Sequence, residues 1–116
     1  MRIKEKMDGD IAILTLMGDL ISEADAADIR NKLHSLVSDD IKKVIIDLGD
    51  VTYINSLGLG ALITARSTMI NATGELKLAQ VGKKIESLMV MVGLVKLFDL
   101  YETVDRAIGS FKSKKK

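Results

Sequence analysis

The chain has 116 residues, of which 47% are hydrophobic but only 3% aromatic, so we expect one domain with an aliphatic core. It contains no cysteine and one histidine, His34, which excludes disulfides, thiolate metal sites and histidine-rich metal sites. The net charge is +1, and without the four lysines of residues 112–116 thirteen basic residues face sixteen acidic ones, so with few aromatic side chains for base stacking we expect no direct binding to nucleic acid.

Two features of the sequence bear on the compartment in which the protein is expected. No stretch approaches the roughly 20 uninterrupted apolar residues of a membrane span, and residues 1–6 alternate like a strand instead of forming the apolar run of a signal peptide. We therefore expect a cytoplasmic protein without membrane insertion. Residues 1–111 are expected to form the domain, and the basic residues 112–116 a disordered tail, with a membrane or nucleic-acid contact as the alternative for the tail.

The first half of the chain predicts a hairpin and a helix. Two strand-like runs, residues 3–7 and 11–17, are separated by Asp8-Gly9-Asp10, whose glycine can adopt the positive φ of a tight turn, so the runs should pair antiparallel. Ser22 then precedes a segment with apolar residues at helical spacing, and we predict Ser22 as its N-cap. Asp25 should lie near the positive end of the helix dipole.

The second half alternates strands and helices. Residues 44–48 are β-branched and apolar on both faces, which is typical of a central strand covered on both sides. Helical spacing begins at Ser56 and continues to Ile70. Further strands are predicted at residues 76–81 and, briefly, at 97–100, with helices at 83–92 and 103–111. The order predicts an α/β fold in which about four helices cover a mixed β-sheet of four to five strands.

The informative segment is the start of the helix at Ser56, which follows a buried strand and a short loop. The first turn of a helix has unpaired N–H groups and a partial positive charge, so it accommodates an anion. Asn55 and Ser56 are both good N-cap residues, and the alternative interpretation is that one of them serves only to cap the helix. Gly58 and Gly60 each cost helix stability, of order 1 kcal/mol relative to Ala, and so require a reason such as the close approach of another backbone. Bare backbone beside Ser56 would make its hydroxyl accessible.

The whole chain resembles a STAS domain and is similar to the bacterial anti-sigma factor antagonists. The resemblance rests on residues 18–20 (GDL), 47–48 (DL) and 93–98 (GLVKLF), and above all on residues 53–60 (YINSLGLG). This last segment matches the family's aspartate-serine-x-glycine-leucine-glycine signature, except that Asn55 stands where the family usually has aspartate. The lost charge either alters the docking of a kinase or marks a member outside the phosphorylation cycle.

The resemblance implies a STAS-type single domain that acts as a non-catalytic switch. In that family an anti-sigma factor that is also a serine kinase of the GHKL type phosphorylates the motif serine, and a serine phosphatase reverses the modification. The unphosphorylated antagonist binds the anti-sigma factor and thereby releases the sigma factor. Carried over by position, Ser56 is the phosphoacceptor, and no cofactor is implied. The implied partner-binding residues are Asp19, Asn55, Ser56, Leu57, Gly58, Leu59 and Gly60.

An enzyme is disfavoured by the same segment. Ser56 lies where the nucleophile of a strand-turn-helix elbow would lie, but Ile54 replaces the glycine two residues before it, and His34 is the one possible imidazole. The glycines lack the spacing and the lysine of a P-loop. Three aspartates near predicted strand ends suggest a magnesium cluster but are expected to be solvated: Asp19, Asp47 and Asp50.

The alternative function is that of a STAS scaffold, either in a signalling assembly or as the cytosolic subunit of a lipid-transport complex, without a phosphorylation cycle. The chain offers one further feature for such a role. Residues 89–92 and Leu94 form an apolar run too continuous for one buried helical face, so part of it is expected at the surface as a partner site. The opposite expectation is that the fold of a small domain hides most of this run.

Overall fold

The computed structural model describes residues 1–113 of the chain as five strands, four α-helices and one short 3-10 helix. In chain order they are β1 (Arg2–Asp8), β2 (Ile11–Met17), α1 (Glu23–Ser38), β3 (Lys43–Asp50), α2 (Ser56–Asn71), β4 (Glu75–Ala79), α3 (Lys83–Met91), η1 (Val95–Leu97), β5 (Asp99–Tyr101) and α4 (Val104–Lys112). Lys112, the first residue assigned to the tail, is the last residue of α4. Residues 114–116 of that tail lie outside the described residues.

The strands form one sheet in the order β1-β2-β3-β4-β5. Strand β1 pairs antiparallel with β2, and Gly9 joins them with a φ of +61°. Strands β2, β3, β4 and β5 are parallel to one another. The predicted hairpin and the predicted mixed sheet are therefore confirmed, and β3 lies at the centre as expected.

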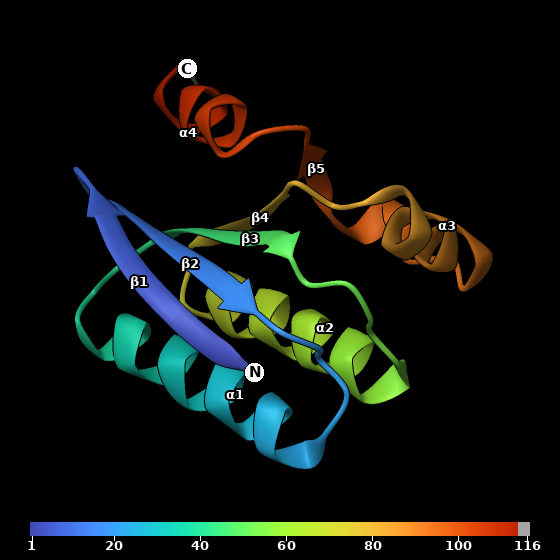
Figure 1. Cartoon of the computed structure of the whole chain (residues 1–116). Helices are drawn as coiled ribbons and strands as arrows, with labels where there is room; N and C mark the ends of the chain where they lie inside the picture. Colours follow the sequence, from blue (N-terminus) through green and yellow to red (C-terminus); the bar gives the residue numbers. More distant parts are fainter. Residues whose placement is uncertain (114–116) are drawn as a thin grey trace.

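Helices cover both faces of the sheet. Helices α1 and α2 lie side by side on one face, and α4 lies on the other (Figure 1). The larger core is formed between the sheet and α1, α2 and α3, and the smaller one beneath α4 includes Ile45, Ala107 and Phe111. Residues 44–48 are all buried because β3 contributes side chains to both cores. Within residues 1–113, no helix combines the length and hydrophobicity that a membrane crossing requires.

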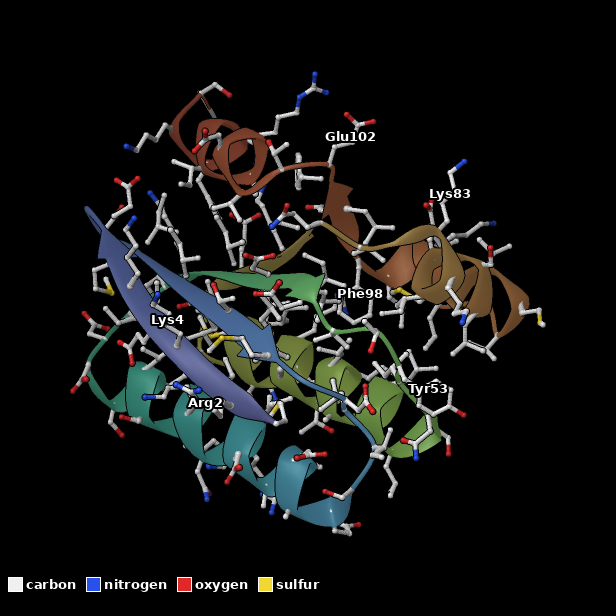
Figure 2. The ribbon with its side chains drawn as sticks, in the orientation of Figure 1. Arg2, Lys4, Tyr53, Lys83, Phe98 and Glu102 are labelled. Carbon is white, nitrogen blue, oxygen red and sulfur yellow. The ribbon has the colours of Figure 1, made fainter. Side chains whose placement is uncertain are left out.

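The segment after α3 differs from the prediction. The last strand is Asp99–Tyr101, and residues 95–97 form the 3-10 helix η1 instead of entering the sheet. Pairing with β4 begins only at Asp99, which lies opposite Lys77. Phe98 has a buried side chain in the larger core (Figure 2). The apolar character of Phe98 thus reflects core packing before the strand and not strand pairing, whereas Leu97 is exposed at the end of η1.

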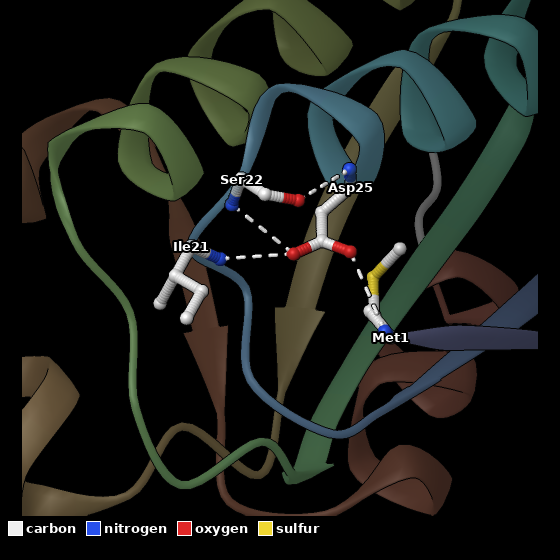
Figure 3. A network of polar contacts seen from close by, with 4 residues as sticks. All are labelled: Met1, Ile21, Ser22 and Asp25. Carbon is white, nitrogen blue, oxygen red and sulfur yellow. Dashed lines mark hydrogen bonds and ion pairs between the residues drawn. The ribbon is translucent and has the colours of Figure 1, made fainter.

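Ser22 caps α1 as predicted, and the cap belongs to a larger polar network (Figure 3). The Ser22 hydroxyl accepts the backbone N–H of Asp25 at 3.1 Å, and the Asp25 carboxylate accepts the N–H of Ser22 at 3.1 Å. The same carboxylate accepts the N–H of Ile21 at 3.1 Å and pairs with the Met1 ammonium at 3.4 Å. Burial opposes ionisation, but the bonds from Ile21, Ser22 and Met1 together hold the pKa of Asp25 below its usual range.

We expect Asp25→Asn to lower the free energy of unfolding by about 2 kcal/mol at neutral pH, because bonds to a charged acceptor are lost. A carboxyl whose folded-state pKa is depressed stabilises the fold above its unfolded pKa of about 3.9, and this contribution is lost as the pH falls through the folded-state pKa. Urea unfolding should therefore show a difference in the free energy of unfolding between variant and parent that narrows below about pH 4. Asp28→Asn, at an exposed position of α1, is the control. If the difference in the free energy of unfolding did not change with pH, the stabilising role of the ionised Asp25 carboxylate would be contradicted.

Candidate functional site

The site lies at the edge of the sheet where the parallel strands end and helices α1, α2 and α3 begin (Figure 1). The loops that precede α1 and α2 are joined there by a parallel bridge between Leu20 and Ile54. The Leu20 N–H donates to the carbonyl of Tyr53 at 3.0 Å, and the Asn55 N–H donates to the carbonyl of Leu20 at 3.4 Å. These bonds fix the start of α2 against the start of α1.

Asn55 is the N-cap of α2, so of the two candidate caps Ser56 is left free. The Asn55 side-chain Oδ1 accepts the Gly58 N–H at 3.1 Å. Its Nδ2 donates to the carbonyl oxygen of Ile21 at 2.9 Å. An ionised aspartate has no N–H to donate, so Asn55 makes a link to the α1 loop that a carboxylate at this position could not make.

The Ser56 side chain is exposed at the first position of α2. Among residues 1–113 its hydroxyl has no hydrogen-bond partner. Its neighbour Leu57 is 41% exposed, so neither side chain is enclosed by the fold. The hydroxyl is therefore within reach of an approaching enzyme or protein partner, as the sequence predicts.

The two glycines of the motif have different environments. A Cβ on Gly58 would lie 2.6 Å from Cγ1 of Ile54 and closer still to the carbonyl oxygen of Leu20, so the predicted close approach of another backbone is confirmed there. A Cβ on Gly60 would meet no atom within 4 Å. The prediction of a close approach is therefore wrong for Gly60, which borders open space.

The remaining residues expected to bind a partner divide by burial. Leu59 and Gly58 are buried, which leaves them a role in positioning the exposed residues beside them. Asp19 is exposed, and its carboxylate accepts the hydroxyl of Thr52 at 3.0 Å. Thr52 and Ser56 line one hollow, described next, and the bond to Thr52 therefore places Asp19 at the rim of the site.

Ser56 borders two hollows. The first, which we call the α2–α3 groove, has a volume of about 480 Å³ and lies between the start of α2 and one side of α3. Its lining is Thr52, Tyr53, Ile54, Asn55, Ser56, Leu59, Lys84, Ile85, Ser87, Leu88, Met91 and Val92. The second, the α1–α2 hollow, has a volume of about 240 Å³ and includes Arg30, Leu57 and Gly60 in its lining. A modification of Ser56 would therefore alter both concave surfaces.

The apolar run of α3 forms one side of this site. Met89 is fully buried, whereas Val90, Met91 and Val92 are 58%, 76% and 53% exposed. The expectation that part of the run reaches the surface is confirmed, and the opposite expectation, that the fold hides most of it, is wrong. Tyr53 and Lys84 were not among the predicted site residues, because nothing in the sequence indicates that the start of α2 and α3 face the same groove.

The residues considered for enzymatic or metal chemistry do not assemble. His34 is exposed on α1 and lines neither hollow. Asp47 is buried, contrary to the expectation of a solvated side chain, since it accepts bonds from the Gly49 N–H at 2.9 Å and Gln80 Nε2 at 2.8 Å. In the described part of the chain, no three His, Cys, Asp or Glu side chains are grouped so that they could hold a metal ion.

Comparison with known proteins relates the whole chain to one family. A family model described as STAS domain matches residues 2–107. The protein "Putative anti-sigma factor antagonist BtrV" of Bordetella bronchiseptica is 26% identical over 109 residues, which cover 94% of this chain and 92% of that protein.

Two solved structures show the same fold. The crystal structure of a protein described as a "putative anti-sigma factor antagonist" from Thermotoga maritima matches with a TM-score of 0.85 at 20% identity, covering 93% of this chain and 92% of that one. The Bacillus cell fate determinant SpoIIAA in its phosphorylated form matches with a TM-score of 0.74 at 16% identity, covering 95% of this chain and 99% of that one.

Proposed function

The chain belongs to the STAS domain family, and from that membership we propose that it is an anti-sigma factor antagonist whose binding is switched by phosphorylation of Ser56. The observation that carries the proposal is the exposed Ser56 hydroxyl, which has no partner among residues 1–113 and lies between two hollows at the start of α2. The similarity to BtrV and to the phosphorylated form of SpoIIAA supports the proposed class.

The proposed cycle requires two enzymes and no catalytic group in this chain. The unphosphorylated protein binds an anti-sigma factor in the cytoplasm, and the sigma factor is released. The anti-sigma factor, a serine kinase of the GHKL type, transfers the terminal phosphoryl group of ATP to the Ser56 hydroxyl and leaves ADP, and a serine phosphatase hydrolyses the ester to restore the hydroxyl and release inorganic phosphate. Asp19, Asn55, Leu57 and Gly60 form the proposed partner surface around Ser56, while Gly58 and Leu59 hold it in place.

The position of Ser56 explains how the fold would tolerate this modification. A phosphate carries about −1.5 to −2 charges at neutral pH. At the first turn of a helix an exposed anion gains roughly 0.3–1 kcal/mol from the N–H groups and the helix dipole. Helix α2 has no acidic residue in its first turn, so no neighbouring carboxylate of that turn opposes the charge. Phosphorylation should therefore change the surface without unfolding the domain.

Asn55 bears on recognition by the kinase. The amide keeps the cap of α2 and adds the bond to Ile21, while it removes the negative charge that the family's usual aspartate would place beside Ser56. The proposed partner therefore meets a neutral N-cap residue, and its own surface at this point needs no cation. This fits a phosphorylation cycle in which the phosphate, and not the N-cap residue, supplies the negative charge at the start of α2.

Affinity capture from the native host tests the proposed class. The bait is the unmodified chain, and the matched bait carries Ser56→Asp. Recovery of a GHKL-type serine kinase by the unmodified bait, and its loss with Ser56→Asp, would support the proposal. Recovery of permease or ATPase subunits by both baits would instead support a transport-complex subunit and contradict the antagonist role.

A further inference from the structure

We propose that the α2–α3 groove binds an amphipathic helix of the protein partner, which places an apolar stripe in the groove and a carboxylate against Lys84. The inference rests on the proposed function, because the partner is the protein whose binding Ser56 controls. It specifies the kind of partner segment that binds, and it adds Lys84 to Ser56 as a residue of the switch.

Exposed apolar side chains concentrate at this groove. The described residues include nine large hydrophobic side chains that are exposed, and three of them, Tyr53, Met91 and Val92, line this groove. Two more are close by in the chain: Leu57 lines the α1–α2 hollow, which shares Ser56 with the groove, and Val90 precedes Met91 on α3. Isolated exposed hydrophobic residues are ordinary on a protein surface, but a contiguous patch beside a hollow indicates an interaction site. Met91 is the most exposed of the five, and a flexible thioether side chain adapts well to a partner surface.

The spacing of the lining residues favours a helix as the occupant. Ile85, Leu88 and Val92 recur at steps of three and four along α3 and its C-cap, so they form one ridge along that helix. The opposite wall, which includes Leu59, comes from α2 and the loop before it. A helix with apolar residues at the same spacing would lie along this ridge, as in other helix-in-groove complexes.

The charge of the groove specifies the sign of the charge that the partner should carry. Lys84 is the one charged side chain among the lining residues, and it forms no ion pair with any residue of the described range 1–113. Glu86 of the same helix lines a different hollow, with Tyr101 and Glu102. A partner carboxylate would therefore complete the site. A second copy of this chain fits poorly, because it would bring another Lys84 to the same groove.

Lys84 also connects the groove to the switch, because Ser56 lines the same groove. A phosphate on Ser56 has the same sign as the partner carboxylate and repels it. The phosphate is also a strong acceptor for Lys84, so it competes for the cation that the carboxylate needs. Phosphorylation would thus weaken binding in two ways, through repulsion and through the loss of a counter-ion.

Two designed helical peptides test the inference on the full chain. Both carry the same stripe of leucines, flanked by glutamates in one peptide and by lysines in the other. Titration into isotope-labelled protein should move the NMR signals of residues 53–57 and 84–92 saturably, and the glutamate peptide should bind about tenfold more tightly, a difference of about 1.4 kcal/mol. Lys84→Glu should reverse the preference. Ser56→Asp should weaken only the glutamate peptide.

Lys83→Glu is the matched control, because it makes the same charge change one residue away. Lys83 is exposed, does not line the groove, and projects from the side of α3 remote from Tyr53 in Figure 2. This variant should keep the preference for glutamate.

Four results of the peptide titrations would overturn the inference: no saturable shift at the groove, shifts confined to another face, equal affinity for both peptides, or a preference that Lys84→Glu leaves unchanged. Concentration-dependent shifts at the groove without peptide would also overturn it, in favour of a second copy. The proposed function fails separately, if Ser56 is never phosphorylated while the peptide preference persists.

Discussion

Replacing Ser56 with aspartate is expected to weaken binding of the anti-sigma partner about 100-fold while the fold stays intact. In a docked interface the added charge must lose its water without gaining a counter-ion from the partner. A penalty of about 3 kcal/mol is modest for such a group and corresponds to this loss of affinity. In the free protein the same charge lies at an exposed helix start and costs nothing comparable.

Titration calorimetry with the purified partner kinase measures the affinity, and circular dichroism checks the fold. Ser56→Ala should bind like the parent and accept no phosphate. Ser67→Asp is the matched control: it makes the same change at another exposed serine of α2, outside the lining of both hollows, and should leave the affinity unchanged. Equal affinity of the parent and Ser56→Asp would refute the switch, as would an equal loss for Ser67→Asp.

Gly58→Ala should lower the free energy of unfolding by about 3 kcal/mol, the upper part of the range for overpacked cores. Its methyl group would collide with the carbonyl oxygen of Leu20, which is backbone and cannot rotate away. The collision can be relieved only by separating the loop before α1 from the start of α2. Ser56 would then be displaced, so partner binding should also fall.

Gly60→Ala makes the same change two residues later and should have the opposite effect. The new methyl group meets open space, and alanine in a helix interior is more stable than glycine by about 0.5–1 kcal/mol. Urea unfolding of both variants and the parent measures the two effects. Similar stability of the two variants would show that the contact between Gly58 and Leu20 does not constrain the site as described.

Local signals in the sequence predicted much of this fold. The turn at Gly9, the cap at Ser22 and the doubly buried strand at residues 44–48 each depend on neighbours in the chain or on a simple period, and all three are present in the structure. The reason for Gly58 was also predictable, because a glycine in the first turn of a helix is costly unless something lies against it.

The features that were missed depend on contacts between distant segments. The second bond of Asn55 reaches Ile21, which is 34 residues away in the sequence. The buried Asp47 of β3 accepts a bond from Gln80, which follows β4 and is 33 residues away in the sequence. Lys84 belongs to the site only because α3 packs beside the start of α2. No periodicity within a segment carries such information, so the motif could be predicted from the sequence and the groove beside it could not.

Mass analysis of the protein isolated from its native host decides whether Ser56 is phosphorylated. We expect a species heavier by about 80 Da, removed by phosphatase treatment, with the added mass on the peptide that contains Ser56. The anti-sigma partner should co-purify with the lighter, unphosphorylated species and not with the heavier, phosphorylated one. A phosphate on another residue, or a Ser56 peptide that stays unmodified whether the partner is bound or free, would contradict the proposed switch at Ser56.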